Sequence, residues 1–132
     1  MKYLVDTHYL LWSLIEPDRL DHRTRSILQN TEDIKQVSVI SFWEISLKYA
    51  LGKLKLTGTT PEELVTSAEE SGYQVLDLDA SVVAGAHNLP FHADHKDPFD
   101  RLLIWQCIQQ GVTMLTADSR FAEYRRDGLK LV

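Results

Sequence analysis

Short apolar runs alternate with segments of helical pattern along the chain. The apolar runs predict strands, which lie at residues 2–5, 36–40, 74–78 and 112–116, with a final edge strand at 129–132. Helical segments separate these runs, so consecutive strands need crossover connections. This order implies an α/β protein with a mainly parallel sheet of four to five strands, right-handed crossovers and helices on both faces.

Helix starts are marked by residues that can cap free backbone N–H groups. Asp21 precedes one short helix and Asp79 another, and residues 60–61, Thr-Pro, begin a third. Residues 41–44 read Ser-Phe-Trp-Glu, which has the form of a capping box. The sequence therefore predicts a helix that begins there and runs through Ala50.

The most apolar helix is predicted at residues 98–110. Asp97 is a good N-cap, Pro98 suits the first helical position because its missing N–H would be unpaired there, and Gly111 suits the end. Asp100 lies in the first turn. Apolar side chains cover most of this helix, so we expect it to be largely buried. Its one narrow polar stripe is formed by Gln106, Gln109 and Gln110.

Acidic residues gather at one edge of the predicted sheet. Asp6, Glu44 and Asp118 each lie near the end of a strand. Asp97 and Asp100 open a helix whose N-terminus faces the same edge, where ligands of parallel sheets bind. Each acid alone also has a structural interpretation, because first-turn carboxylates are stabilised by about 0.3 to 1 kcal/mol without any chemistry. Their convergence is what predicts a functional site.

Several ionised carboxylates need cations to share one crevice. Two of them about 4 Å apart repel by roughly 4 kcal/mol at an effective dielectric near 20. A site of oxygen ligands without thiolates suits Mg²⁺ or Mn²⁺. Such ions activate water and stabilise charge on a phosphate undergoing attack. The predicted chemistry is therefore metal-assisted phosphodiester hydrolysis.

Length and composition narrow the alternatives. The 132 residues are expected to form a single domain, residues 1–132, and the lone Cys107 to pack as a small hydrophobe. The net charge of −5 argues against a protein that coats nucleic acid, although an acidic metal site keeps a nuclease compatible. No segment predicts a signal sequence or a membrane span, so we expect a cytoplasmic protein. His92 and His95 lie near acids, but their spacing matches no closed zinc set.

Four motifs span nearly the whole chain. They are VDTH (5–8) followed by LW (11–12); SFWEI (41–45) followed by Lys48 and GKL (52–54); HKDPFDRLLI (95–104); and LTAD (115–118) followed by Phe121 and Tyr124. In this set and order the chain resembles the PIN-domain ribonucleases, specifically the VapC-type toxins of toxin-antitoxin pairs. One departure is Trp105, where this branch commonly has a small residue, so its bulk must be absorbed by neighbouring helices or an interface.

The resemblance implies a three-layer α/β/α sandwich of the PIN type and Mg²⁺-dependent endoribonuclease activity, with Mn²⁺ as the alternative ion. Asp97 is expected to cap its helix and support the metal ligands. Thr7, Thr116 and Ser119 are expected to be hydroxyl neighbours of those ligands. Four acids match the site of the family residue by residue and are the expected catalytic and metal-binding residues: Asp6, Glu44, Asp100 and Asp118.

The resemblance also implies partners. These are an RNA substrate (tRNA, mRNA or rRNA), a cognate antitoxin whose C-terminal segment lies in a groove near the site, and a second copy in a homodimer. Our hypothesis is that Asp6, Glu44 and Asp100 hold a metal that activates water, while Asp118 orients a second metal or a water. The products would carry a 5′-phosphate and a 3′-hydroxyl. Four cations are candidates for contacts to RNA phosphates: Arg101, Lys48, Lys53 and Lys55.

Two rival functions fit less of the sequence. A phosphorylation-dependent receiver module is also a small parallel α/β domain, but here Asp77 lies inside an apolar alternation and no lysine follows the strand that ends at Asp118. A PIN-like module that binds RNA or a partner without cutting would not need all four acids. The three lysines around Gly52 also have a plain interpretation as a solvated face.

Overall fold

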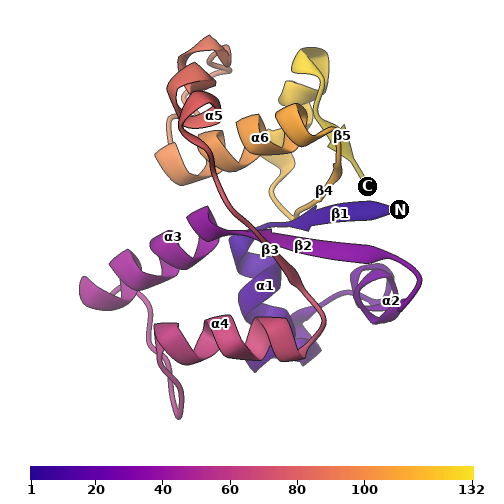
Figure 1. The fold of residues 1–132 in the computed structure, drawn as a ribbon, viewed down its shortest axis with the longest axis vertical. Coiled ribbons are helices and arrows are strands. Elements are labelled where there is room, and N and C mark those ends of the chain that lie inside the picture. The colour runs from indigo at the N-terminus through magenta and orange to yellow at the C-terminus, as the bar shows by residue number, and fades with distance from the viewer.

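A single parallel sheet runs through the computed structural model, which describes residues 1–132 (Figure 1). All four strand pairings are parallel, and the strand order is β3-β2-β1-β4-β5. The predicted α/β class and parallel sheet are therefore confirmed. The strands are β1 (Lys2–Val5), β2 (Ile34–Ser38), β3 (Gln74–Leu76), β4 (Thr113–Leu115) and β5 (Lys130–Leu131).

Helices cover both faces of the sheet, as the crossovers require. Figure 1 shows α5 and α6 on one face and α1, α2 and α4 on the other, with α3 leading away from the carboxyl edge of β2. The α-helices are α1 (Thr7–Ile15), α2 (His22–Gln29), α3 (Val39–Ala50), α4 (Pro61–Glu70), α5 (Ala80–Gly85) and α6 (Pro98–Gln110). The 3₁₀ helices are η1 (Pro17–Arg19), η2 (Ala86–Asn88) and η3 (Ser119–Asp127).

Predicted helix starts are confirmed at four places. The side chains of Asp21, Thr60, Asp79 and Asp97 each accept a hydrogen bond from the backbone N–H three residues on. Gly111 ends α6 in the left-handed conformation, with a φ of 67°, as its predicted place after the helix requires. These caps are local signals, so the sequence locates them well.

The start of α3 was predicted wrongly. The helix begins at Val39 with Ser38 as its N-cap, whose hydroxyl accepts from the N–H of Ile40, so residues 41–44 do not form a capping box. Strand β2 ends at Ser38, which is its last residue paired with β3. Ser41 and Glu44 consequently lie within the helix, so helix capping does not explain the position of Glu44.

The sheet is sandwiched between two apolar clusters. One packs Leu4 and Met114 against α6, and the other packs Val5 and Leu115 against α1 and α4. Alternate residues of β1 thus point to opposite faces, as a strand covered on both sides requires. This packing on both faces fixes the positions of the carboxyl ends of β1 and β4 relative to the helices.

Two expectations about α6 had different outcomes. Gln106 was placed on a polar stripe with Gln109 and Gln110, but it is buried, and its amide donates to the carbonyl of Asp77. Trp105 lies over Gly85, where a Cβ would be 3.4 Å from the indole, and its Nε1 donates to the carbonyl of Val82. Its bulk is therefore absorbed by α5.

Cys107 is buried, and burial raises the pKa of its thiol to about 12. It packs as a small hydrophobe, as predicted. None of the helices combines the length and the apolar composition needed to cross a bilayer.

The strand order reverses direction at β1, because β2 and β3 extend to one side of it and β4 and β5 to the other. Crevices form at the carboxyl ends of the strands at such a point. Asp6 follows β1 directly, and Asp118 follows β4 after two residues.

Candidate metal centre

Asp6 is a helix cap that is almost fully buried. Its Oδ1 accepts from the N–H of Tyr9 at 2.8 Å, and its Oδ2 accepts from the hydroxyl of Thr116 at 2.5 Å. Only 6% of the residue is exposed. Burial raises the pKa of Asp6, although these two hydrogen bonds oppose the rise. The carboxylate is therefore oriented by hydrogen bonds but forms no ion pair with a cationic side chain.

Asp100 lies in the first turn of α6 and is oriented by a histidine. Its backbone N–H donates to Asp97 Oδ1 at 2.9 Å, and its Oδ2 lies 3.0 Å from His95 Nε2. His95 is 3% exposed and packs against the rings of Phe121 and Tyr124. Burial raises the pKa of Asp100, and the hydrogen bond from His95 opposes the rise.

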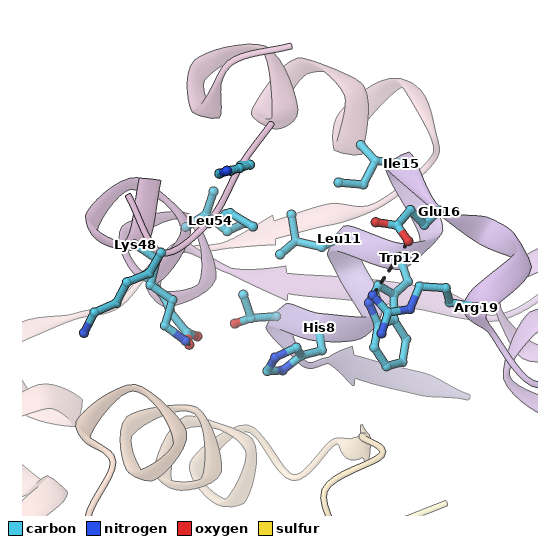
Figure 2. A pocket seen from close by; sticks show the side chains of 13 residues that line it. His8, Leu11, Trp12, Ile15, Glu16, Arg19, Lys48 and Leu54 are labelled. Atoms are coloured by element: carbon cyan, nitrogen blue, oxygen red, sulfur yellow. Dashed lines mark hydrogen bonds and ion pairs between the residues drawn. The ribbon is translucent and has the colours of Figure 1, made fainter. Parts of the chain in front are cut away.

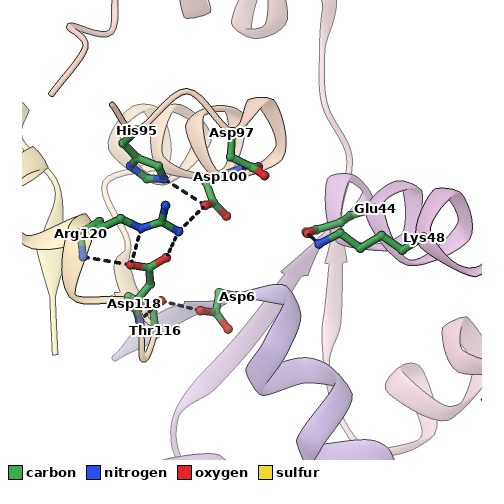
Figure 3. Close-up of polar contacts among 9 residues, drawn as sticks. All are labelled: Asp6, Glu44, Lys48, His95, Asp97, Asp100, Thr116, Asp118 and Arg120. Atoms are coloured by element: carbon green, nitrogen blue, oxygen red, sulfur yellow. Dashed lines mark hydrogen bonds and ion pairs between the residues drawn. The ribbon is translucent and has the colours of Figure 1, made fainter. Parts of the chain in front are cut away.

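Asp118 is held by a cation. Arg120 donates from Nε to Oδ1 at 3.0 Å and from Nη2 to Oδ2 at 2.6 Å (Figure 3). These bonds lower the pKa of Asp118. The backbone N–H of Asp118 in turn donates to the hydroxyl of Thr116, which also contacts Asp6. Thr116 therefore links the acids that follow β1 and β4.

Glu44 faces the other acids from the second turn of α3 (Figure 3). It is 4% exposed, and its Oε2 pairs with Lys48 Nζ at 2.5 Å, one turn further along the helix. Its Oε1 is buried and accepts no hydrogen bond. Next to it in the fold, the hydroxyl of Thr7 donates to that of Ser41 and ties α1 to α3. A buried carboxylate oxygen without a donor calls for a cation or a bound water.

The four predicted acids line a single cavity of about 170 Å³. Asp97, Thr7, Lys48 and Arg120 line it as well, whereas only one of the ten lining residues is hydrophobic. Ligand atoms of Asp100, Asp118 and His95 lie within 4.8 Å of one another. Asp6 and Glu44 complete the wall from the side of α1 and α3. A donor set of carboxylate oxygens, one of them buried and unpaired, fits a hard divalent cation such as Mg²⁺.

A larger groove of about 320 Å³ adjoins the acidic cavity (Figure 2). The two hollows adjoin, because four residues line both: Thr7, His8, Glu44 and Lys48. Leu11, Trp12, Ile15, Ile45 and Leu54 supply the apolar part of the lining. Cationic residues add positive charge to it: Arg19, Lys48, Lys53 and Lys55. The groove thus combines an apolar surface with cations next to the acids.

Two predicted contributors lie elsewhere. Arg101 donates to the carbonyls of Leu89 and Pro90 and stacks over the ring of Phe91, 3.7 Å from its centroid. It is not among the residues that line the acidic cavity. Ser119 lines a separate cavity beside Asp118. Ser119 therefore neighbours Asp118, but neither Ser119 nor Arg101 lines the cavity that the four acids share.

Two residues of the site, His95 and Arg120, were not predicted from the sequence. Arg120 lies between the motif residues Asp118 and Phe121, and no sequence pattern marks it as a partner of Asp118. His95 was considered only as a zinc ligand, although it lies five residues before Asp100.

Comparisons with known proteins relate the whole chain to one family. Residues 3–127 match the PIN domain family. The chain is 27% identical over 122 residues to Ribonuclease VapC22 of Mycobacterium tuberculosis (strain ATCC 25618 / H37Rv), a match that covers 92% of this chain and 91% of the relative.

Solved structures share the fold at low sequence identity. The DNA-bound VapBC of Salmonella typhimurium aligns with a TM-score of 0.66 at 20% identity, covering 100% of this chain and 97% of that one. FitAcB of Neisseria gonorrhoeae aligns at 0.64 and 20% identity, covering 98% and 95%. VapBC2 of Rickettsia felis, bound to a promoter DNA fragment, aligns at 0.63 and 17% identity, covering 100% and 98%. These similarities support the predicted PIN-like sandwich.

Proposed function

Because the chain belongs to the PIN-domain family, we propose that it is a metal-dependent endoribonuclease whose active site is the acidic cavity. One observation carries the proposal. Four carboxylates from α1, α3, α6 and the turn after β4 line one small cavity at the point where the strand order reverses. A set of helix caps would have no reason to converge in this way.

The residues have distinct roles in this proposal. A divalent ion, Mg²⁺ or alternatively Mn²⁺, would be held by Asp6, Glu44 and Asp100, and would supply an activated water and stabilise charge on the phosphate. Asp118 would orient a second ion or a water. Thr116 fixes the oxygens of Asp6, and Asp97 fixes the first turn of α6, so that the carboxylates are held in place before substrate binds.

The adjoining groove is the proposed path of the RNA. Lys53 and Lys55 line it and form no ion pair, and Lys48 connects it to the acids through Glu44. They are the proposed contacts to backbone phosphates. Arg101 is left out, because its guanidinium is engaged with the carbonyls of residues 89 and 90.

We also propose that the chain acts as the toxin of a toxin-antitoxin pair. Its relatives include a named VapC ribonuclease, and solved structures of VapBC complexes share its fold. The same groove would accept the C-terminal segment of an antitoxin. Growth arrest on expression, relieved by co-expression of the protein encoded by the adjacent reading frame, tests this role.

A homodimer is part of the proposal. Trp43 is 59% exposed and borders an apolar hollow of about 270 Å³ between α3 and α6, lined also by Phe99 and Leu102. We assign the dimer contact to this surface. Light scattering should give a dimer for the wild-type protein and a monomer for Trp43→Glu.

The decisive experiment is cleavage of a mixed tRNA and mRNA pool. Wild-type protein should cut with Mg²⁺ and not with EDTA, and Asp100→Asn should lose about 100-fold or more of the activity. Asp94→Asn, an exposed acid of the preceding loop, is the matched control and should retain it. Unchanged cleavage in EDTA and in Asp100→Asn would overturn the proposal. Metal binding without cleavage would instead favour the non-cutting module.

A further inference from the structure

Arg120 supplies a cation inside the acidic cavity. Both carboxylate oxygens of Asp118 accept hydrogen bonds from its side chain, and its Nη2 lies 3.7 Å from Asp100 Oδ2 (Figure 3). Asp118 Oδ1 also accepts from the backbone N–H of Arg120. While these bonds are in place, Oδ1 accepts two hydrogen bonds and Oδ2 accepts one from the guanidinium, so Arg120 competes with a metal or a water for Asp118.

The contact between Arg120 and Asp118 is built so that it can open. Only Ser119 separates the two residues in the chain, so the pair joins neighbouring parts of one turn. Rotation of the arginine side chain can therefore break the ion pair without any movement of the backbone. The side chain of Arg120 is 60% exposed, and it can therefore leave without disturbing packed groups. Lys48 differs, because its partner Glu44 has a side chain that is only 5% exposed. Exposed ion pairs contribute little net free energy, so a doubly charged ion can compete with this one.

Arg120 is also the only arginine that lines the cavity. The planar guanidinium can bind two oxygens of a phosphate at once, which a lysine ammonium cannot do. Arg120 lines the cavity with a side chain that is 60% exposed, so its guanidinium is accessible to a phosphate that approaches the acids.

We propose that Arg120 is a substrate-binding residue that neutralises Asp118 and Asp100 in the metal-free protein, yields Asp118 when a divalent ion binds, and then binds the RNA phosphate. The inference rests on the proposed nuclease function. Arg120 would thus bind two anions in succession, first a carboxylate of the protein and then a phosphate of the substrate. If the pair with Asp118 were only a local structural contact, removing Arg120 would affect neither ion binding nor RNA binding.

The first half of the test is the affinity for Mn²⁺, measured by calorimetric titration of the full chain. Arg120→Gln should bind Mn²⁺ about two- to five-fold more tightly than wild type, the range expected for loss of an exposed pair. Arg126→Gln removes the same charge from the same helix, where Arg126 is exposed and forms no ion pair, and should leave the affinity unchanged. Equal affinities for wild type and Arg120→Gln, or equal gains in both variants, overturn the inference.

The second half is binding of a labelled single-stranded RNA of mixed sequence. Ca²⁺ replaces Mg²⁺ in one series, and EDTA is present in the other. Arg120→Gln should weaken binding several-fold more than Arg126→Gln in Ca²⁺, and no more than Arg126→Gln in EDTA. A loss of the same size in both series overturns the inference. Absence of Mn²⁺ binding in wild type and both variants contradicts the proposed function as well, whereas equal Mn²⁺ affinities contradict only the role of Arg120.

Discussion

Two helix N-termini use the same residue for the same bond and yet differ in character. Asp21 caps α2 by accepting from the N–H of Thr24 at 2.7 Å, and Asp6 caps α1 by accepting from the N–H of Tyr9 at 2.8 Å. Asp21 is exposed, and hydrogen bonds to Thr24 lower its pKa. Asp6 is buried beside other acids, and burial raises its pKa. A capping bond explains Asp21 completely but leaves the charge of Asp6 uncompensated.

The difference shows how a helix cap can be told from a metal ligand. Both roles need a carboxylate at an N-terminus, so the local sequence cannot separate them. What separates them is the surroundings of the residue: Asp6 lines a cavity that it shares with Glu44, Asp100 and Asp118. Holding like charges together at the site therefore lowers the stability of the fold.

The largest expected difference between the two caps is in catalysis. Asparagine keeps the capping oxygen at either position but removes the negative charge. Asp6→Asn should lose about 100-fold or more of the Mg²⁺-dependent RNA cleavage, because it removes a proposed ligand. Asp21→Asn should cleave as wild type does. Similar rates for the two variants would mean that Asp6, too, is only a cap.

A second pair of matched residues tests how the acids are oriented. His95 contacts Asp100, and His92 contacts Asp127 outside the cavity, while both rings pack on Tyr124. His95→Ala should weaken Mn²⁺ binding about ten-fold, the usual effect of losing a residue that orients a ligand. His92→Ala should leave Mn²⁺ binding intact even if it lowers the melting temperature. Equal losses of Mn²⁺ affinity would assign the effect to general destabilisation.

Stability without metal should change in opposite directions at the two caps. Asp6→Asn removes a buried charge and should raise the free energy of unfolding by about 1 kcal/mol. Asp21→Asn removes a favourable interaction with the end of α2 and should lower it by about 0.5 kcal/mol. Urea unfolding in EDTA measures both values. A loss of stability in Asp6→Asn would contradict the account of an uncompensated carboxylate.

The smallest expected effect is the pH dependence of these differences. The raised pKa of Asp6 means that its ionisation destabilises the fold as pH rises above the unfolded value of 3.8, so the advantage of Asp6→Asn should grow from about pH 4 to pH 7. The lowered pKa of Asp21 means that its contribution is present above 3.8 and is lost as pH falls below that value. Thermal melts of the three proteins in EDTA across this range should show the two opposite slopes.

Local rules were enough to predict most of the fold. The caps at Asp21, Thr60, Asp79 and Asp97 depend on neighbouring residues, and all four are present. The start of α3 was misplaced by three residues because Ser38 and Ser41 can both cap, and only pairing with the neighbouring strand decides where β2 ends. Burial of Gln106 was missed because its partner, the carbonyl of Asp77, is distant in sequence.

The residues of the candidate site also fall into those that local sequence predicts and those that depend on packing. Asp6 and Asp118 could be placed in advance, since any residue that follows a strand of a parallel sheet reaches its carboxyl edge. Arg120 and His95 could not, because their roles depend on the direction of a side chain after the elements have packed. The outcome for Arg101 shows the reverse error, in which a suitable charge at a suitable position turns toward a loop carbonyl instead.

Asp6, Glu44 and Asp100 are proposed to hold one divalent ion, and an anomalous difference map from crystals soaked in Mn²⁺ would locate such an ion. The strongest peak should lie between the carboxylates of Asp6, Glu44 and Asp100, within coordination distance of their oxygens, and it should be absent in Asp6→Asn. A wild-type map without a peak in this cavity, or a peak that persists unchanged in Asp6→Asn, would contradict this proposal.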